Sequence, residues 1–246
     1  MPSPDLKVHS PASEPHSAAN SPHAPGDEAH WERTRLVEQR LPGIALDGGY
    51  FRGRKMIHHD SKISGGVCVG GGGREAIVVD WRHEGREGKG ASLATLYDAA
   101  VQRSTVDGRF RKNLALKAVF DTVNEHFTDR SPTGVYCVTQ AVGGGPDSKV
   151  HIDCFISKGT GVCRHTALTC AAILERMIER GLLAGQVSND RNSIPGKGAH
   201  AWCRYTSSTG AVIILDVMQN FFGTLEGSQK KGVWDYARPE DKRKAA

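Results

Sequence analysis

A cysteine, a histidine and an aspartate follow one another in the C-terminal half of this 246-residue chain. Cys163 comes after the glycine-containing turn 159–162 and before an apolar helical pattern, which predicts that it lies at a helix N-terminus. The unpaired N–H groups and the dipole of a helix start stabilise an anion, and the thiolate is the nucleophilic form of cysteine. The same N–H groups can bind the oxyanion that forms when a carbonyl is attacked. Cys163 is therefore the candidate nucleophile.

A thiol nucleophile needs a general base, and His200 stands where the Gly- and Pro-rich stretch 193–199, predicted to be a loop, meets a predicted strand. That strand, residues 201–206, is followed after a short turn by a second one, residues 211–215, which predicts an antiparallel hairpin. Asp216 ends the second strand, so pairing would bring its carboxylate to the start of the first. A carboxylate beside an imidazole fixes the tautomer and orientation of the ring. His200 is the candidate base and Asp216 the orienting acid.

Apolar periodicity predicts the elements that hold these residues. A helix is predicted to follow Cys163 and to stop before Gly181. Ser92 is predicted to cap an earlier helix, and another helix is predicted from about residue 110 to 127. Strands are predicted at residues 77–79, 135–138 and 150–156. The predicted buried positions are Leu93, Leu96, Ala100 and Val101 in the first helix, Leu114, Leu116, Val119, Phe120 and Val123 in the second, and Ala167, Leu168, Ala171, Leu174, Met177 and Ile178 after Cys163.

The first thirty residues differ in composition from the rest of the chain. They hold six of the eleven prolines and five serines, with only three large apolar residues. Such a segment buries too little apolar surface to offset its ordering entropy, which predicts a disordered tail over residues 1–30. A short helix is predicted to begin at Trp31 and to end at Pro42-Gly43. Residues 31–246 are predicted to form a single domain.

Composition and charge narrow the class of protein. Apolar residues make up 38% and charged residues 24%, as in a globular protein, and the longest apolar run is far shorter than the roughly 18 residues that cross a bilayer. The N-terminus lacks the basic start and apolar core of a secretory signal. We therefore expect no membrane partner and a cytoplasmic protein, with export through the Ser/Pro-rich N-terminus as the alternative. The net charge of +5 is scattered, so no nucleic-acid partner is expected.

The cysteines and a glycine run allow two further interpretations. Because the chain is long and lacks a secretory signal, its six cysteines are expected to be free thiols. A zinc site is the metal alternative, but its possible members show no CxxC or HxxxH spacing. These members are Cys154, Cys163, His165, Cys170, His200 and Cys203. The run Gly70–Gly73 lacks the Lys-Ser/Thr of a phosphate loop and predicts a turn between strands. No metal and no cofactor is expected.

The three motifs in this order resemble the transglutaminase-like superfamily of papain-type thiol enzymes. The motifs are Gly161-Val-Cys-Arg-His-Thr-Ala-Leu168, His200-Ala-Trp202 and Ile214-Leu-Asp-Val-Met218, and the resemblance covers about residues 150–226. The first and third look most similar to the peptidase-like domain found in the N-terminal regions of plant Raf-like kinases and in bacterial relatives. The resemblance implies an α+β fold with a papain/transglutaminase-like core, in which the nucleophile helix packs on an antiparallel sheet.

The resemblance also implies roles for individual residues. Cys163, His200 and Asp216 would form the catalytic triad, and because the plant kinase domains look as if they lack the histidine, its presence here favours an active site. A polar oxyanion helper is usual upstream of the nucleophile. Candidates for oxyanion or substrate contacts are Gln140, His151, Gly161 and Trp202, with core packing as the alternative for the tryptophan. Arg164 and His165, in the first helical turn, are expected to bond or pack against neighbouring loops.

The implied activity is cysteine-dependent acyl transfer on amide bonds of protein or peptide substrates. Water as acceptor would make the chain a protease or deamidase, and an amine as acceptor would make it a transglutaminase. The alternative is a catalytically inactive binding module that keeps the fold, as the kinase-attached relatives suggest. A third possibility, compatible with the first, is an exported bacterial effector that modifies host proteins. Neither the acceptor nor the oligomeric state follows from the residues.

Overall fold

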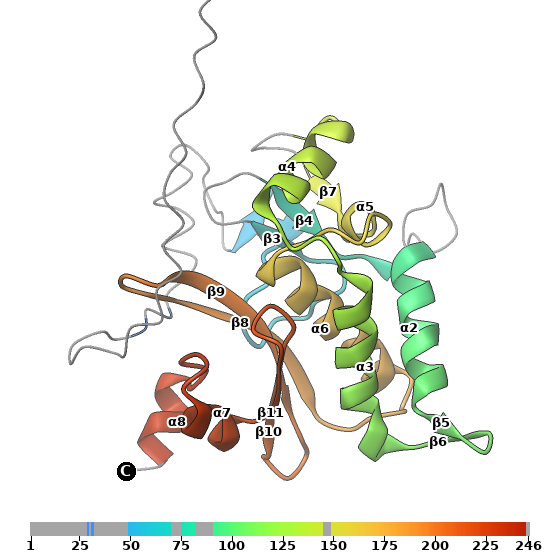
Figure 1. The fold of residues 1–246 in the computed structure, drawn as a ribbon, viewed down its shortest axis with the longest axis vertical. Coiled ribbons are helices and arrows are strands. Elements are labelled where there is room, and N and C mark those ends of the chain that lie inside the picture. Colours follow the sequence, from blue (N-terminus) through green and yellow to red (C-terminus); the bar gives the residue numbers. More distant parts are fainter. Residues whose placement is uncertain are drawn as a thin grey trace, which may run out of the picture.

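The computed structural model describes residues 29, 31, 49–69, 75–81, 91–144 and 149–244. Their fold is α+β, with helices and several sheets (Figure 1). One large cluster of buried apolar side chains lies among these elements. Apart from residues 29 and 31, the predicted tail, the predicted helix after Trp31 and the predicted turn at Gly70–Gly73 lie outside the described residues. Within the described ranges, no helix is long and apolar enough to cross a membrane.

The largest sheet is antiparallel and has the strand order β11-β10-β9-β8. Its strands are β8, Gln186–Ile194; β9, Gly198–Thr206; β10, Val212–Asp216; and β11, Phe221–Thr224. The predicted hairpin is confirmed as β9 and β10, with Val212 opposite Thr206 and Leu215 opposite Cys203. The arm that carries the histidine is longer than predicted, so that His200 is its third residue rather than its entry point.

Strand β8 is one of the elements that the sequence does not predict. It reads Gln-Val-Ser-Asn-Asp-Arg-Asn-Ser-Ile and has no apolar face, yet Ser188, Asn189 and Asp190 are buried. Buried polar groups are tolerated where they are hydrogen-bonded, and Arg238, almost fifty residues away, binds both Ser188 and Asp190. The predicted loop 193–199 is therefore wrong in extent, because its two ends belong to β8 and β9.

Helix α6, Cys163–Glu179, confirms the helix predicted after the candidate nucleophile. One side packs on β8 and β9 and another on the helices α2 and α3, which makes α6 the central helix of the fold (Figure 1). The chain leaves the helix at Gly181, whose φ of +72° lies in the left-handed region that favours glycine. Packing on both sides holds the N-terminus of α6 beside β9.

The two predicted upstream helices are confirmed as α2, Ala91–Arg103, and α3, Lys112–His126, which pack together (Figure 1). A short hairpin of β5, Thr105–Val106, and β6, Arg109–Phe110, joins them. The predicted burial of Leu114 is wrong, since its side chain is 37% exposed. Val119, Phe120 and Val123 are buried as predicted, Ala115 and Ala118 are buried as well, and Leu116 is partly buried.

The prediction that Ser92 caps α2 is also wrong. Ser92 already lies inside the helix, and its backbone N–H donates to the carboxylate of Asp153 at 3.0 Å. The N–H of Leu93 donates to the other oxygen of the same carboxylate at 2.9 Å. A distant carboxylate therefore satisfies the first turn of α2, in the place where an anion is favoured by the helix dipole.

Two segments upstream of Cys163 that were predicted to be strands are wholly or partly helical. Residues 135–138 belong to helix α4, Pro132–Ala141, because the Ser131 side chain accepts the N–H of Gly134 and Pro132 suits the first helical position. Residues 150–156 divide between strand β7, Lys149–His151, and helix α5, Ile152–Ile156. The His151 ring accepts the N–H of Asp153 at 3.2 Å and so caps α5. In both places a local cap outweighs the β-branched residues that favour a strand.

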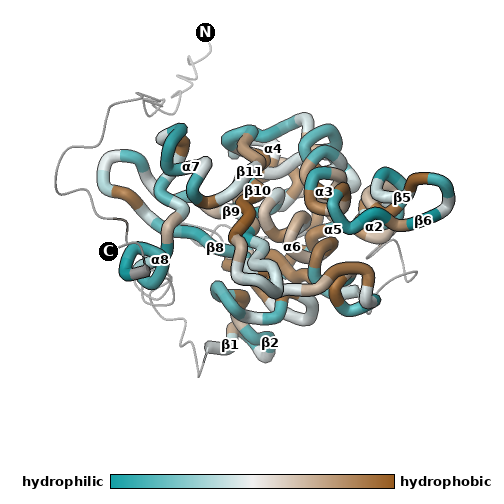
Figure 2. The backbone as a smooth tube through the Cα atoms, turned by 90° about the horizontal axis from the view of Figure 1, so that it is seen from below, coloured by the Kyte–Doolittle hydropathy of each residue, from teal (hydrophilic) through white to brown (hydrophobic). Residues whose placement is uncertain are grey.

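The remaining elements surround this centre. Strand β4 pairs with β3 in an antiparallel and with β7 in a parallel arrangement, which confirms the strand predicted at residues 77–79, one position earlier. Hydrophobic segments lie along parts of α6, β9 and α5, whereas α8 and much of the β5–β6 hairpin are hydrophilic (Figure 2). The bounds are β1, Tyr50–Phe51; β2, Arg54–Lys55; β3, Val67–Val69; β4, Ala76–Val78; α7, Leu225–Lys231; and α8, Pro239–Lys244.

Candidate active site

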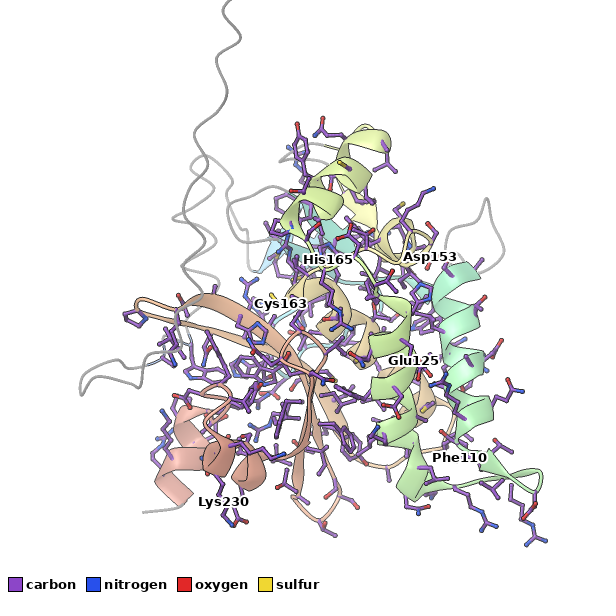
Figure 3. The ribbon with its side chains drawn as sticks, viewed as in Figure 1. Phe110, Glu125, Asp153, Cys163, His165 and Lys230 are labelled. Atoms are coloured by element: carbon purple, nitrogen blue, oxygen red, sulfur yellow. The ribbon has the colours of Figure 1, made fainter. Side chains whose placement is uncertain are left out.

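Cys163 is the first residue of α6 and is half-buried. Figure 3 shows it at the end of α6 that lies toward the β8–β9 hairpin. Val162 precedes it with an extended backbone, and the carbonyl of Val162 accepts the N–H of His165 at 2.9 Å. The N–H groups of the first helical positions have no acceptor within a helix. The thiol therefore lies where the backbone favours negative charge, as the sequence predicts.

His165 stabilises this helix start. Its side chain is fully buried, its ring lies 4.2 Å from the ring of Phe155, and its Nδ1 accepts the N–H of Val162 at 3.2 Å. Burial first, and then the charge of Arg164, hold the pKa of His165 well below its usual range. A neutral ring whose Nδ1 is an acceptor carries its proton on Nε2. His165 therefore acts as a helix cap, in keeping with the structural role expected for it.

The structure brings His200 and Asp216 together across the β9–β10 hairpin. Nε2 of the histidine lies 2.5 Å from Oδ2 of the aspartate, and both side chains are buried. Coupling to the thiol of Cys163 raises the pKa of the imidazole as well, so the thiol lies close to the ring. Since Asp216 occupies Nε2, Nδ1 is the nitrogen left for the sulfur. The three predicted residues thus form one chain of contacts, from carboxylate through imidazole to thiol.

The site favours the ion pair form of the thiol and the imidazole. Burial alone would raise the pKa of Cys163, but the hydrogen bond and charge of His200 outweigh burial. The charge of Arg164 and the N–H of Ala201 add to this, so that the pKa falls below its ordinary 9.0. Burial likewise disfavours the imidazolium, but the hydrogen bonds to Asp216 and Cys163 raise the pKa of His200 to about 10. Both shifts favour the thiolate and imidazolium form of the pair over the neutral form.

Arg164 is held close to the thiol by a buried acid. Its guanidinium forms an ion pair with Glu75, whose side chain is 1% exposed and lies just before β4. The same carboxylate is 3.8 Å from Nε2 of His165. Sequence patterns do not identify Glu75, since no spacing in the chain links residue 75 to residue 164.

Three more residues that sequence reasoning missed surround the triad. Tyr236 donates its hydroxyl to Oδ2 of Asp216 at 2.7 Å, and the backbone N–H of Gln219 donates to Oδ1 at 3.1 Å. The ring of Trp234 lies 5.0 Å from the ring of His200 in an edge-on arrangement. Two aromatic residues in the sequence Trp-Asp-Tyr were the available signal, but nothing local ties them to residues 200 and 216.

The candidates for oxyanion or substrate contacts lie apart from one another. Gln140 is exposed on α4, and its amide donates to the carbonyl of Gly144. His151 is buried, with its Nε2 3.2 Å from the carbonyl oxygen of Asp80. Gln140 therefore has a local partner, and His151 has a distant one in the carbonyl of Asp80. The backbone N–H groups at the start of α6, the helix that begins with Cys163, are the other candidate oxyanion donors.

Gly161 and Trp202 have packing roles. A Cβ on Gly161 would lie 2.7 Å from ring carbon Cε1 of Phe127 and 2.7 Å from Cβ of His165, so the interior itself requires glycine there. Trp202 is fully buried, and its ring contacts those of Tyr236 at 5.0 Å and His200 at 6.1 Å. It forms an aromatic wall behind the triad, in line with the core-packing alternative.

Two other features bear on the chemistry. A cavity of about 680 Å³ lies between α4 and α5, and its walls include Cys137, Cys154 and Thr160 but no member of the triad. Across the described ranges, no cluster of three or more His, Cys, Asp or Glu side chains is placed to hold a metal ion. The six cysteines are free thiols.

Comparisons with protein-family models, with curated proteins and with solved structures found no match, and they assign the chain to no family.

Proposed function

We propose that the chain is a cysteine-dependent acyl-transfer enzyme of the transglutaminase-like kind, acting on amide bonds of protein or peptide substrates. One observation carries the proposal. The imidazole of His200 is bound on one side by the carboxylate of Asp216 and on the other by a thiol at the N-terminus of a helix. The packing of α6 on an antiparallel sheet supports the same kind of core.

The first half-reaction follows from these groups. The Cys163 thiolate attacks the carbonyl carbon of an amide, and the electron pair of the C=O bond moves to oxygen. Backbone N–H groups of the first turn of α6 stabilise the oxyanion. As the tetrahedral intermediate collapses, the C–N bond breaks and the amine takes a proton from the His200 imidazolium. A thioester and a neutral imidazole remain.

The second half-reaction reverses the proton flow. Water or an amine gives its proton to His200 and attacks the thioester carbonyl, and the thiolate leaves. Asp216 stays ionised throughout, holds the ring in place and stabilises the imidazolium when it forms. The net result is hydrolysis of the amide or transfer of its acyl group to an amine, with the protein returned to its starting state.

Thiol labelling tests the nucleophile. Native protein is treated with iodoacetamide at pH 7, and mass spectrometry follows each cysteine with time. Cys163 should react faster than the exposed Cys137, although it is half-buried, and the variant His200→Ala should lose that advantage. If Cys163 reacts no faster than Cys137 in the wild type, the activated nucleophile is wrong.

Substrate chemistry tests the activity. Candidate proteins and peptides are incubated with wild type and with Cys163→Ala, with and without an added primary amine, and their masses are compared. Cleavage or a deamidation shift in the wild type alone identifies water as acceptor, and amine incorporation identifies a transglutaminase. Binding of a partner by both proteins without any mass change would favour the inactive binding module instead.

A further inference from the structure

The segment after α7 passes directly behind the paired His200 and Asp216. We name residues 233–238 the C-terminal clasp. It begins after the left-handed Gly232 that ends α7 and runs up to α8. It lies beyond the part of the chain that resembles the transglutaminase-like superfamily. Its position next to the triad is therefore a property of the tertiary structure.

Tyr236 is the member of the clasp that touches the triad acid. Its side chain is fully buried, and its ring stacks on Phe221 at 5.7 Å and meets Trp202 edge-on at 5.0 Å. Packing on two sides fixes where the hydroxyl lies, 2.7 Å from Oδ2 of Asp216. Burial, and then the charge of Asp216, raise the pKa of Tyr236, so the hydroxyl remains a protonated donor.

The rest of the clasp is tied to the strand beside His200. Trp234 donates its Nε1–H to Oδ1 of Asn192 at 2.7 Å, and the amide of Asn192 donates to the carbonyl of Asp235 at 2.6 Å. Asn192 stands directly opposite His200 in the β8–β9 pairing. The ring of Trp234 in turn lies against His200. These contacts fix the position of the clasp relative to strands β8 and β9.

A buried ion pair anchors the far end of the clasp. Nε and one terminal nitrogen of Arg238 each donate to the carboxylate of Asp190 at 2.7 Å, and the same terminal nitrogen donates to Ser188 at 2.8 Å. A two-point bond between guanidinium and carboxylate fixes geometry as well as charge. The phenol of Tyr236, two residues earlier, is therefore carried on a rigid support.

We propose that Tyr236 is a positioning residue, whose hydroxyl holds the Asp216 carboxylate in the rotamer that keeps Oδ2 on Nε2 of His200. The torsion that turns a carboxylate is broad, so the plane of this one is set by its donors. Oδ1 has the N–H of Gln219, and Oδ2 has the hydroxyl and the imidazole. This role rests on the proposed acyl-transfer function.

A further titratable group near Asp216 is the thiol of Cys170 on α6. Burial first, and then the charge of Asp216, raise the pKa of Cys170. That thiol is therefore neutral over the working range. His200 itself is acted on by Asp216 and Cys163. If a substitution at position 236 changes how the labelling rate of Cys163 depends on pH, the change therefore reflects the interaction between the Asp216 carboxylate and the His200 imidazole.

The test compares two deletions of a phenolic hydroxyl. Tyr236→Phe removes the donor to Asp216. Tyr205→Phe, the matched control on β9, removes a hydroxyl that donates to the carbonyl of Ala184, away from the triad. Iodoacetamide labelling of Cys163 is measured from pH 5 to 9, with thermal unfolding as the check on folding. A proton NMR spectrum gives the resonance of the His200 Nε2–H, which a short bond to a carboxylate moves downfield.

Loss of a hydrogen bond to a charged group corresponds to roughly a tenfold change in an equilibrium. Tyr236→Phe should therefore slow labelling of Cys163 at pH 6 by about tenfold, shift the profile to higher pH and move or broaden the Nε2–H resonance, whereas Tyr205→Phe should match the wild type. A Tyr236→Phe profile that matches Tyr205→Phe, or that shifts to lower pH, overturns the positioning role. If wild-type Cys163 labels no faster than Cys137, the proposed function fails as well.

Discussion

Two buried charge clusters join the four-stranded sheet to the C-terminal segment, and they differ in what they leave open. Arg238 donates hydrogen bonds to the side-chain oxygens of Asp190 and Ser188, which belong to strand β8. His200 is satisfied by Asp216 on one nitrogen only, and its other nitrogen meets the thiol of Cys163. The first cluster is closed and structural. The second keeps one proton-transfer position facing a nucleophile, which is what acid–base chemistry needs.

From this difference we predict that substitutions in the cluster of His200 and Asp216 lower the reaction rate. Substitutions in the cluster of Arg238 and Asp190 should instead lower the free energy of unfolding. The largest expected effect is on rate. Asp216→Asn keeps the shape of the side chain and the acceptor for Tyr236 but removes the charge that supports the imidazolium. We expect acyl transfer to fall by roughly 10²–10⁴-fold, as measured by single-turnover kinetics. An unchanged rate with an intact fold would mean that Asp216 does no more than end a strand.

The closed cluster should show the opposite response. Arg238→Met leaves the carboxylate of Asp190, which is 0% exposed, without its cation. Removing one partner of a buried pair costs about 3–5 kcal/mol in the free energy of unfolding, measurable by urea denaturation. Lys230→Met, which breaks the exposed pair with Glu226, is the control and should leave the midpoint unchanged. Equal midpoints for both variants would contradict the assignment of a structural role to Arg238.

The pH dependence of stability sharpens the same contrast. The folded pKa of His200, about 10, lies above its ordinary 6.5. Its charge interactions therefore stabilise the fold fully below pH 6.5, and this contribution is lost as the pH rises through about 10. The unfolding free energy of wild type relative to His200→Gln should decline across that window. A difference that is constant from pH 6 to 10 would show that the imidazole is not held in its charged form.

The smallest expected effect concerns Gly161, at the entrance to α6. Gly161→Ala places a methyl group against Phe127 and His165, so we expect a loss of about 1–3 kcal/mol in unfolding free energy. Gly227→Ala in α7 is the control, since its Cβ would come no closer than 3.1 Å to the Thr224 hydroxyl. A Gly161→Ala variant of wild-type stability with impaired substrate binding would instead favour the substrate role.

Sequence patterns located the triad better than they located its surroundings. Cys163 at a helix start and the pairing of β9 with β10 follow from local signals, an apolar helical face and two apolar runs joined by a turn. Strand β8 and helix α4 do not. The first is mostly polar, with Val187 and Ile194 as its apolar residues, and the second has β-branched residues that only the Ser131 cap and the preceding turn override.

The sequence by itself determined which residues could do the chemistry and that a hairpin would bring two of them together. Only the tertiary structure decided which other side chains surround these residues. Glu75, Tyr236 and Trp234 reach the site from segments that share no period or spacing with it. Side chains of this kind are placed by packing between distant elements, and a one-dimensional pattern records period and turn chemistry but not such contacts. The pKa of Cys163 is lowered by His200 and Arg164, and that of His200 is raised by Asp216 and Cys163, so these shifts also depend on tertiary contacts.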